Sequence, residues 1–240
     1  AGSQGHRESD RRAVIETFAR DGFCIVPNVV DGLVIADLIA VLEGANVTRS
    51  RRGEDVFGAR NLLMVPEIRE LANSIALLDL VHQVLGAGAA PSRGIFFDKT
   101  PGANWPVAWH QDLTLAVRAR CETPRWTNWT VKGGINHVNP PISVLQNMLT
   151  LRLMLDDCDS DNGPLRVLPG SHLLDRLSRD DILKLCASGT ERECLGKTGS
   201  VIMMRPLLLH ASSPARNPRH RRVVHLEYVA RGAIPASLLS

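Results

Sequence analysis

The stretch Leu149-Thr150-Leu151-Arg152-Leu153-Met154-Leu155 alternates leucine with other residues. Successive side chains of a β-strand point to opposite faces, so this alternation predicts a strand with one apolar face. Further short stretches after Pro91 follow the same period and are separated by Pro, Gly and Asn, which favours a β-sandwich or barrel. These stretches are residues 93–97, 107–117, 165–168, 201–204, 207–211 and 222–229.

The residues before Pro91 show a different period. From Asp31 to Gly44 the apolar residues recur as they do on one face of a helix, and this is the clearest helical pattern in the chain. Other expected elements are a helix from Ser9-Asp10 to Gly22, a strand over 23–26, a mobile loop over 48–55, and a helix over 66–85 broken near Ser74. We therefore expect the helices to pack outside one β domain.

The composition limits the class of protein. The chain has 240 residues, 44% of them hydrophobic and 22% charged, which is typical of a globular protein. We expect a single domain over residues 1–240: a disordered terminus or tag over 1–8, a mostly helical part over 9–90 and a β core over 91–231. A net charge of +3 is too small for nucleic-acid binding to be the main function, and no apolar run is long enough for a membrane span.

The cysteines bear on the cellular compartment. There are five, none in a C-x-x-C pair, so the sequence encodes neither a disulfide framework nor a zinc ribbon. A reducing, cytoplasmic compartment fits this usage best.

One segment without a clear period interrupts the predicted strands. Residues 123–141 contain three prolines and two tryptophans, and a long aperiodic loop in a compact domain is often a binding loop or lid. Trp126, Trp129 and His137 are therefore candidate substrate contacts. The alternatives are core packing for the tryptophans and simple exposure for His137.

A candidate metal site begins at His110-Gln111-Asp112. On a strand, residues two apart share a face, so His110 and Asp112 can approach one cation. A third ligand must come from another strand, and His210 is preferred because it ends the apolar run 207–209; the other candidates are His137, His172, His220 and His225. Two His and one carboxylate leave three coordination positions open, as in non-haem Fe(II) sites. The alternative is a core histidine beside a turn-capping Asp112.

Three motifs together resemble a known family. They are Trp109-His110-Gln111-Asp112, the stretch from Asn162 to His172 (NGPLRVLPGSH), and His210-Ala211-Ser212 followed by Arg221-Arg222. In this order they resemble the phytanoyl-CoA dioxygenase family of Fe(II)/2-oxoglutarate oxygenases. The resemblance implies a mainly β fold with flanking helices, a double-stranded β-helix (a cupin-like jelly roll), with the N-terminal helices packed outside.

The resemblance also assigns roles to individual residues. It implies that His110, Asp112 and His210 hold Fe(II) and that Arg221 pairs with the far carboxylate of 2-oxoglutarate, for which a planar guanidinium is better suited than an ammonium group. Ser212 would donate a further hydrogen bond. Lys99 matches lysines that lie near the co-substrate in relatives, although a solvated surface lysine is the alternative. Arg222, by the period of two, should point to the opposite face and be structural.

The expected function follows from these roles. The chain would use Fe(II), 2-oxoglutarate and O₂ to hydroxylate or otherwise oxidise a small-molecule metabolite, while 2-oxoglutarate is decarboxylated to succinate and CO₂. The alternatives are a zinc hydrolase on the same three ligands and a non-catalytic binding domain. Partners other than a small-molecule substrate are not indicated, and the sequence specifies neither the substrate nor the oligomeric state.

Overall fold

The computed structural model describes residues 2–47, 49–52, 55–120, 123–235 and 238, and for residues 2–11, 52 and 55 it describes the backbone alone. The helices are α1 (Gly2–Asp21), α2 (Gly32–Gly44), α3 (Pro66–Ala72), α4 (Ile75–Leu85), α5 (Ile142–Leu145) and α6 (Arg179–Ser188), with the 3-10 helices η1 (Leu62–Met64) and η2 (Ser171–Leu173). None of the helices in these ranges combines the length and the apolar character that crossing a membrane requires.

The strands form three antiparallel sheets. The largest has the order β1-β12-β9-β14-β4-β3-β2, the second β11-β10-β13-β5, and the smallest β6-β8-β7. The bounds of the first sheet are β1 (Phe23–Val26), β2 (Arg49–Arg52), β3 (Asp55–Ala59), β4 (Ala90–Lys99), β9 (Met148–Met154), β12 (Val201–Met204) and β14 (Arg221–Val229). Those of the other two are β5 (Val107–His110), β6 (Leu115–Val117), β7 (Thr127–Lys132), β8 (Ile135–Asn139), β10 (Leu165–Val167), β11 (Arg192–Cys194) and β13 (His210–Ser212).

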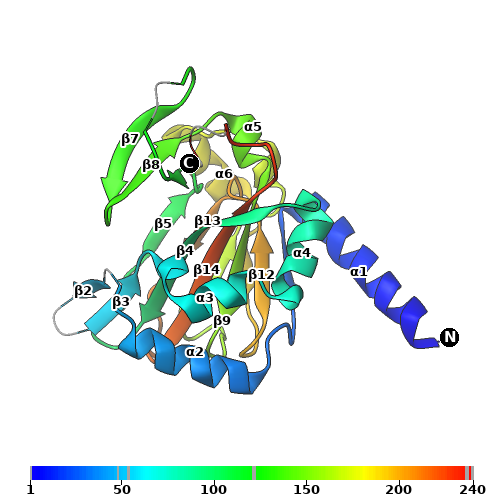
Figure 1. Cartoon of the computed structure of the whole chain (residues 1–240), viewed down its shortest axis with the longest axis vertical. Coiled ribbons are helices and arrows are strands. Elements are labelled where there is room, and N and C mark those ends of the chain that lie inside the picture. The colour runs from blue at the N-terminus through cyan, green and yellow to red at the C-terminus, as the bar shows by residue number, and fades with distance from the viewer. Residues whose placement is uncertain (1, 48, 53–54, 121–122, 236–237, 239–240) are drawn as a thin grey trace.

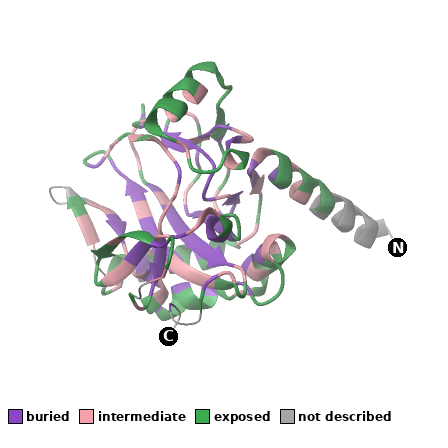
Figure 2. Cartoon of the chain, turned by 90° about the horizontal axis from the view of Figure 1, so that it is seen from above, coloured by how far each residue is buried: buried purple, intermediate pink, exposed green. Residues whose placement is uncertain are grey.

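The outer face of the seven-stranded sheet forms the main apolar core. Helices α2, α3 and α4 lie across this face (Figure 1), and burial is concentrated in the strands beneath them, while the helices expose their outer sides (Figure 2). The leucines of β9 pack there against helix residues such as Leu38 and Leu71. Apolar area withdrawn from water is the main favourable term in folding, so this face supplies most of the stability.

The inner face of the same sheet lies opposite the four-stranded sheet. A second apolar cluster joins the two, with Met154 and Met204 from the large sheet packed against Leu165 and Val167 of β10. As a result every residue of β9 is buried, including those between the leucines. Residues facing into the space between the sheets must therefore be apolar, be paired, or face a ligand.

Several predicted elements are confirmed. The strand over 23–26 is β1, and α2 follows Asp31, whose side chain accepts a hydrogen bond from the backbone N–H of Leu33 at 2.8 Å and so caps the helix. The helix predicted over 66–85 is divided near Ser74 as expected, because Asn73 ends α3 and Ser74 caps α4. Strands β1 to β3 join the large sheet, so the mostly helical part of the chain also contributes to the β core.

The segments 48–55 and 123–141 were expected to be loops, and both expectations are wrong because the segments contain paired strands. Residues 49–52 form β2, an edge strand beside β3; its arginines suggested a loop, but charged side chains are common on sheet edges. Residues 127–139 form the hairpin β7–β8, which turns at Gly133 and Gly134 with φ of 58° and 79°. This Gly-Gly pair is a hairpin signal that the tryptophans and prolines around it obscured. Whether the hairpin acts as a mobile lid stays a prediction.

Other boundaries also differ from expectation. The strand predicted over 107–117 is interrupted between β5 and β6, and the one predicted over 207–211 begins only at His210. Helix α6 was not predicted, and none of its residues is buried in the core. Helix α1 begins at Gly2, so from there on the terminus expected to be disordered is part of a helix.

Candidate active site

Two neighbouring strands bring two histidines together. His110 ends β5, His210 begins β13, and the two residues are direct partners in the strand register. The Nδ1 of each ring lies 2.8 to 2.9 Å from the carbonyl oxygen two residues earlier, on Ala108 and Leu208 respectively. A carbonyl only accepts, so Nδ1 carries the proton and Nε2 keeps its lone pair. Both imidazoles are thus held in the tautomer that binds a metal through Nε2.

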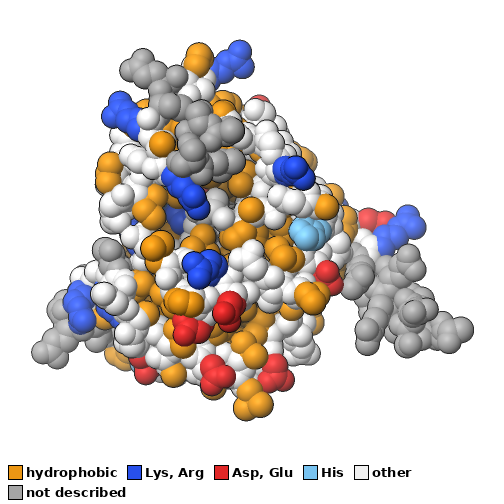
Figure 3. All heavy atoms as spheres, viewed as in Figure 1, with side chains coloured by type: hydrophobic (Ala, Val, Ile, Leu, Met, Phe, Trp, Pro, Cys, Tyr) orange, Lys and Arg blue, Asp and Glu red, His pale blue; other side chains and the backbone are white. Residues whose placement is uncertain are grey.

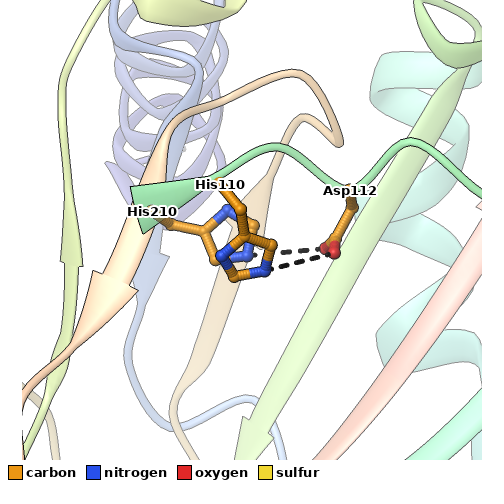
Figure 4. A group of neighbouring side chains, drawn as sticks. All are labelled: His110, Asp112 and His210. Atoms are coloured by element: carbon orange, nitrogen blue, oxygen red, sulfur yellow. Dashed lines mark ion pairs between the residues drawn. The ribbon is translucent and has the colours of Figure 1, made fainter. Parts of the chain in front are cut away.

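Asp112 completes the group from a loop rather than from a strand. Its backbone N–H donates to the carbonyl of Pro206 at 2.8 Å, just after β5 ends. The carboxylate oxygens lie 3.7 Å from Nε2 of His110 and 3.6 Å from Nε2 of His210, as Figure 4 shows. The expected convergence is therefore present, although the argument that His110 and Asp112 share one strand face is wrong.

The protonation states in this group suit a metal. Burial lowers the pKa of His210 to about 4, so the ring is neutral at neutral pH. Burial alone would raise the pKa of Asp112, but the nearby His210 and other basic groups outweigh it, so the net shift is downward and the carboxyl is charged. A metal binds a neutral imidazole and a charged carboxylate. His210 and Asp112 already have these protonation states.

The donor set also fits a metal by geometry. One ligand atom from each of the three residues lies within 4.8 Å of the others. Oδ2 of Asp112 is buried and has no hydrogen-bond partner among the described residues. A buried carboxylate oxygen without a donor is costly unless a cation compensates it. Two imidazoles and one carboxylate match non-haem Fe(II) with open positions, and the same donors can hold Zn²⁺.

The residues expected to bind the co-substrate lie together beside this group. Arg221 and Lys99 are direct partners in the register of β14 and β4, and both are buried. Lys99, only 1% exposed, donates to Oγ of Ser212 at 3.1 Å and to the carbonyl of Ser213. The alternative of a solvated surface lysine is therefore wrong.

The electrostatics at this end of the cavity favour an anion. Nε of Arg221 has no hydrogen-bond partner among the described residues. Burial, followed by the positive charge of Arg221, lowers the pKa of Lys99 to about 7. Two cationic groups packed together without a matching carboxylate would be stabilised by a bound carboxylate.

Arg222, the next residue on β14, has a different environment. Its Nε and Nη2 atoms donate to the carboxylate of Asp156 at 2.9 and 2.7 Å. The side chain is therefore paired and points away from the metal group, as predicted for alternate strand positions.

His110, Asp112, His210, Ser212 and Arg221 line one cavity between the two large sheets, with a volume of about 190 Å³, and Lys99 contacts Ser212 from behind this lining. The cavity walls also include His225, a candidate ligand in the sequence, and residues that the sequence did not single out for this site: Arg93, Ile95, Phe97, Trp105, Val107, Arg152, Leu165 and Ala211. The signal that could have found Arg152 is its position, because it lies on the strand face opposite the leucines of β9.

Three expected substrate contacts lie elsewhere. Trp126 and Trp129 belong to an apolar cluster with Leu115 and Met148, under the β7–β8 hairpin, and do not line the cavity. Trp126 is buried and Trp129 half-buried there, so the core-packing alternative accommodates both, and their contact with a substrate stays a prediction. His137 is buried rather than exposed and lines a smaller neighbouring cavity of about 80 Å³ that shares Arg93 with the first.

The remaining histidines do not compete with His210 as ligands. His172 lies 3.2 Å from the carbonyl of Ala19 and packs against Gly22, so its role is structural. His220 pairs with Asp98 at 2.7 Å. His225 contacts an arginine and a glutamate through both ring nitrogens.

Comparisons with known proteins agree with this geometry. The model of the family "Phytanoyl-CoA dioxygenase (PhyH)" matches residues 18–223. A probable alpha-ketoglutarate-dependent hypophosphite dioxygenase of Stutzerimonas stutzeri is 27% identical over 186 residues, which are 70% of this chain and 54% of that protein. This chain thus spans about half of that relative's length. The L-proline trans-4-hydroxylase of Streptomyces griseoviridis is 24% identical over 248 residues, covering 88% of this chain and 83% of that enzyme.

The fold is also found among solved structures. The epimerase SnoN, in complex with Fe³⁺, alpha ketoglutarate and nogalamycin RO, aligns over 96% of this chain and 90% of its own, with a TM-score of 0.69 and 17% identity. The expected family and the jelly-roll fold with helices outside are therefore confirmed.

Proposed function

Because the chain belongs to the phytanoyl-CoA dioxygenase family, we propose that it is an Fe(II)- and 2-oxoglutarate-dependent oxygenase that hydroxylates or otherwise oxidises a small metabolite. The observation that carries the proposal is the convergence, in one cavity, of three metal-competent side chains and a buried arginine without a hydrogen-bond partner at Nε. Relatives named for hypophosphite and for L-proline support a small-molecule substrate.

Each residue has a defined task in this proposal. His110, Asp112 and His210 would hold the iron through two Nε2 atoms and one carboxylate. Bound iron with 2-oxoglutarate supplies O₂ activation, which oxidises a C–H bond of the substrate and releases succinate and CO₂. Because three protein ligands leave three positions open, the co-substrate and O₂ can both reach the metal.

The co-substrate would be oriented by the far end of the cavity. Arg221 would pair with the far carboxylate through its planar fork of donors, with the hydroxyl of Ser212 and the ammonium of Lys99 beside it. Arg221 and Lys99 lie on adjacent strands of the seven-stranded sheet, and Ser212 lies on β13 of the facing sheet, so regular strands set their positions before the ligand enters. Apolar side chains such as Phe97 and Trp105 line the same space and would exclude water from it.

The two alternative functions need different chemistry. A zinc hydrolase would use the same triad but has no use for a buried arginine and lysine placed to receive a dicarboxylate. A non-catalytic binding domain would not need to keep all three ligands in a metal-binding tautomer. The arrangement of Arg221 and Lys99 therefore favours the oxygenase.

A substrate screen tests the proposal. Iron-loaded protein would be incubated with 2-oxoglutarate and a library of small metabolites, and succinate would be measured. We expect at least one metabolite to stimulate succinate formation, with no stimulation when zinc replaces iron. Turnover of a hydrolysable substrate with zinc, without any succinate, would contradict the oxygenase.

We also propose a cytoplasmic location. The four cysteines in the described part of the chain are free, as expected in a reducing compartment.

A further inference from the structure

A second polar group lies on the inner face of the seven-stranded sheet, away from Arg221. We call it the inner cluster; it consists of Arg93, Arg152, His225 and Glu227. The register places His225 opposite Arg152 on β9, and Glu227 opposite Arg93 on β4. Ligand-capable atoms of His225 and Glu227 lie within 4.8 Å of each other and of the carboxylate of Asp112. The inner cluster thus borders the candidate metal site.

The hydrogen bonds fix the state of His225. Arg152 can only donate, and its Nη1 lies 2.9 Å from Nδ1 of His225, so Nδ1 is the acceptor. Nε2 then carries the proton and donates to Oε1 of Glu227 at 3.2 Å. The ring is neutral and has no lone pair left for a metal, which separates it from His110 and His210. The inner cluster is therefore not a second metal site.

The charges of the inner cluster do not balance. Arg93 forms an ion pair with Glu227, and these two charges offset each other. Arg152 has no ion-pair partner within the described ranges, although its side chain is only 7% exposed. Burial lowers its pKa to about 10, so the guanidinium is still charged at neutral pH.

Arg152 also has unused hydrogen-bonding capacity. Its Nε is buried without a partner among the described residues, and its guanidinium lies 5.6 Å from the ring centre of Phe97 in the cavity wall. The nearby carboxylate of Asp112 offsets part of this charge, but a bound metal would engage that carboxylate. A buried cation without a counter-charge is strongly unfavourable unless a ligand supplies the anion. Nearby, Nε of Arg93 and Oε2 of Glu227 are also unpartnered, so a ligand there can be recognised at more than one point.

The two cationic ends of the cavity are separate. Arg221 and His225 are four residues apart on β14, which is about 13 Å along a strand. Between them the inner face carries Val223 and its partner Phe97. A 2-oxoglutarate molecule that pairs with Arg221 and binds the metal would have both of its carboxylates engaged, which would leave Arg152 for a different anion.

We propose that Arg152 binds an oxyanion of the primary substrate, so that the substrate is a small acid carrying a carboxylate or a phosphorus oxyacid group. The inference rests on the proposed function for placing the oxidation at the neighbouring triad. The cavity of about 190 Å³ is below the roughly 300–1,000 Å³ of sites for drug-sized ligands, which restricts the acid to a small molecule.

The test uses binding of simple probes. Propionate and methylphosphonate would be compared with their uncharged counterparts, propionamide and dimethyl methylphosphonate, by calorimetric titration of protein saturated with Fe(II) and 2-oxoglutarate without oxygen. The same titrations would be made without iron and co-substrate. We expect the acids to bind at least about tenfold more tightly than the neutral probes, a difference of about 1.4 kcal/mol.

Matched variants separate binding from structure. Arg152→Gln removes the charge but keeps an amide that can donate to His225, and it should abolish the preference for acids. Arg152→Lys keeps the charge and should retain part of the preference. Arg166→Gln is the control, because Arg166 pairs with Glu191 and packs over Trp109 outside the cavity.

The outcomes distinguish this inference from the proposed function. Equal binding of acids and neutral probes, or unchanged acid binding in Arg152→Gln, would overturn the substrate class even if Fe(II) and 2-oxoglutarate give their charge-transfer absorption. If that absorption is absent but acids still bind through Arg152, the oxygenase is wrong and the anion site stands. The control variant Arg166→Gln should leave both the absorption and the preference for acids unchanged.

Discussion

The two faces of the seven-stranded sheet are both buried, yet they differ in how their side chains are satisfied. On the outer face, residues such as Leu151 and Leu226 pack against the helices, and no residue of this cluster has a buried, unpartnered side-chain N or O atom within the described ranges. On the inner face, the same strands carry Arg152, Arg221 and Glu227, each with a buried atom that has no partner among the described residues. Burial alone therefore does not separate structural from functional residues. An unsatisfied polar atom in the cavity wall is a better criterion, because His172 and Arg166 carry such atoms outside the cavity.

The surface over the helices completes the comparison. Hydrophobic and acidic side chains alternate over the α2 and α3 side of the molecule in Figure 3, which is the solvent side of the layer that covers the outer face. Charged groups here are solvated. The inner face holds its charges away from water, where each unpaired group costs far more free energy.

The largest effect should come from removing an inner-face ligand. His210→Ala should abolish succinate formation, because a triad of two His and one carboxylate has no spare protein ligand. The melting temperature should change little, since the strand register remains. Full iron-dependent turnover by this variant would mean that a different residue completes the site.

A change on the outer face should have the opposite signature. Leu226→Ala should lower the free energy of unfolding by about 2–5 kcal/mol, because Leu226 is fully buried in the main core. Urea denaturation measures this loss. The folded fraction should bind iron and 2-oxoglutarate as the wild type does; weaker binding by folded molecules would show that the two faces are not independent.

The sequence predicts these faces unequally. The leucine alternation over 149–155 predicts the apolar outer face directly. The motif at His110 indicates the metal ligands, because few residue types bind metals. Arg152 was not predicted as a site residue, because a polar residue between leucines usually faces solvent. In the fold the four-stranded sheet covers this face of β9. The packing of Trp126 could not be predicted for the converse reason: its cluster forms from segments far apart in the chain.

Arg221 and Arg222 are adjacent on β14 but point to opposite faces of the sheet, so variants of the two residues compare the faces directly. Arg221→Lys keeps the charge but loses the planar fork, so the affinity for 2-oxoglutarate should fall about tenfold or more. Arg222→Lys should change it little, because Arg222 pairs with Asp156 on the other face. Titration of both variants with 2-oxoglutarate measures the difference, and the reverse result would assign the co-substrate to Arg222.

The affinity for 2-oxoglutarate should also depend on pH, with a smaller effect than the substitutions above. The pKa of Lys99 is lowered to about 7 by burial and by Arg221, so its ammonium is present below this pH and lost above it. Affinity for 2-oxoglutarate should therefore decline several-fold as the pH rises through about 7, although the bound anion moves the transition upward. In Lys99→Met the decline should be absent. A profile identical in both proteins would remove Lys99 from the co-substrate site.

The central claim is that the inner face holds iron and 2-oxoglutarate together, and an anaerobic titration tests it most directly. Fe(II) and then 2-oxoglutarate would be added to the purified protein while its visible absorption is recorded. We predict one Fe(II) per chain and a charge-transfer absorption that appears only with 2-oxoglutarate and is lost in Asp112→Ala. No absorption in the wild type, or an undiminished one in Asp112→Ala, would contradict the account.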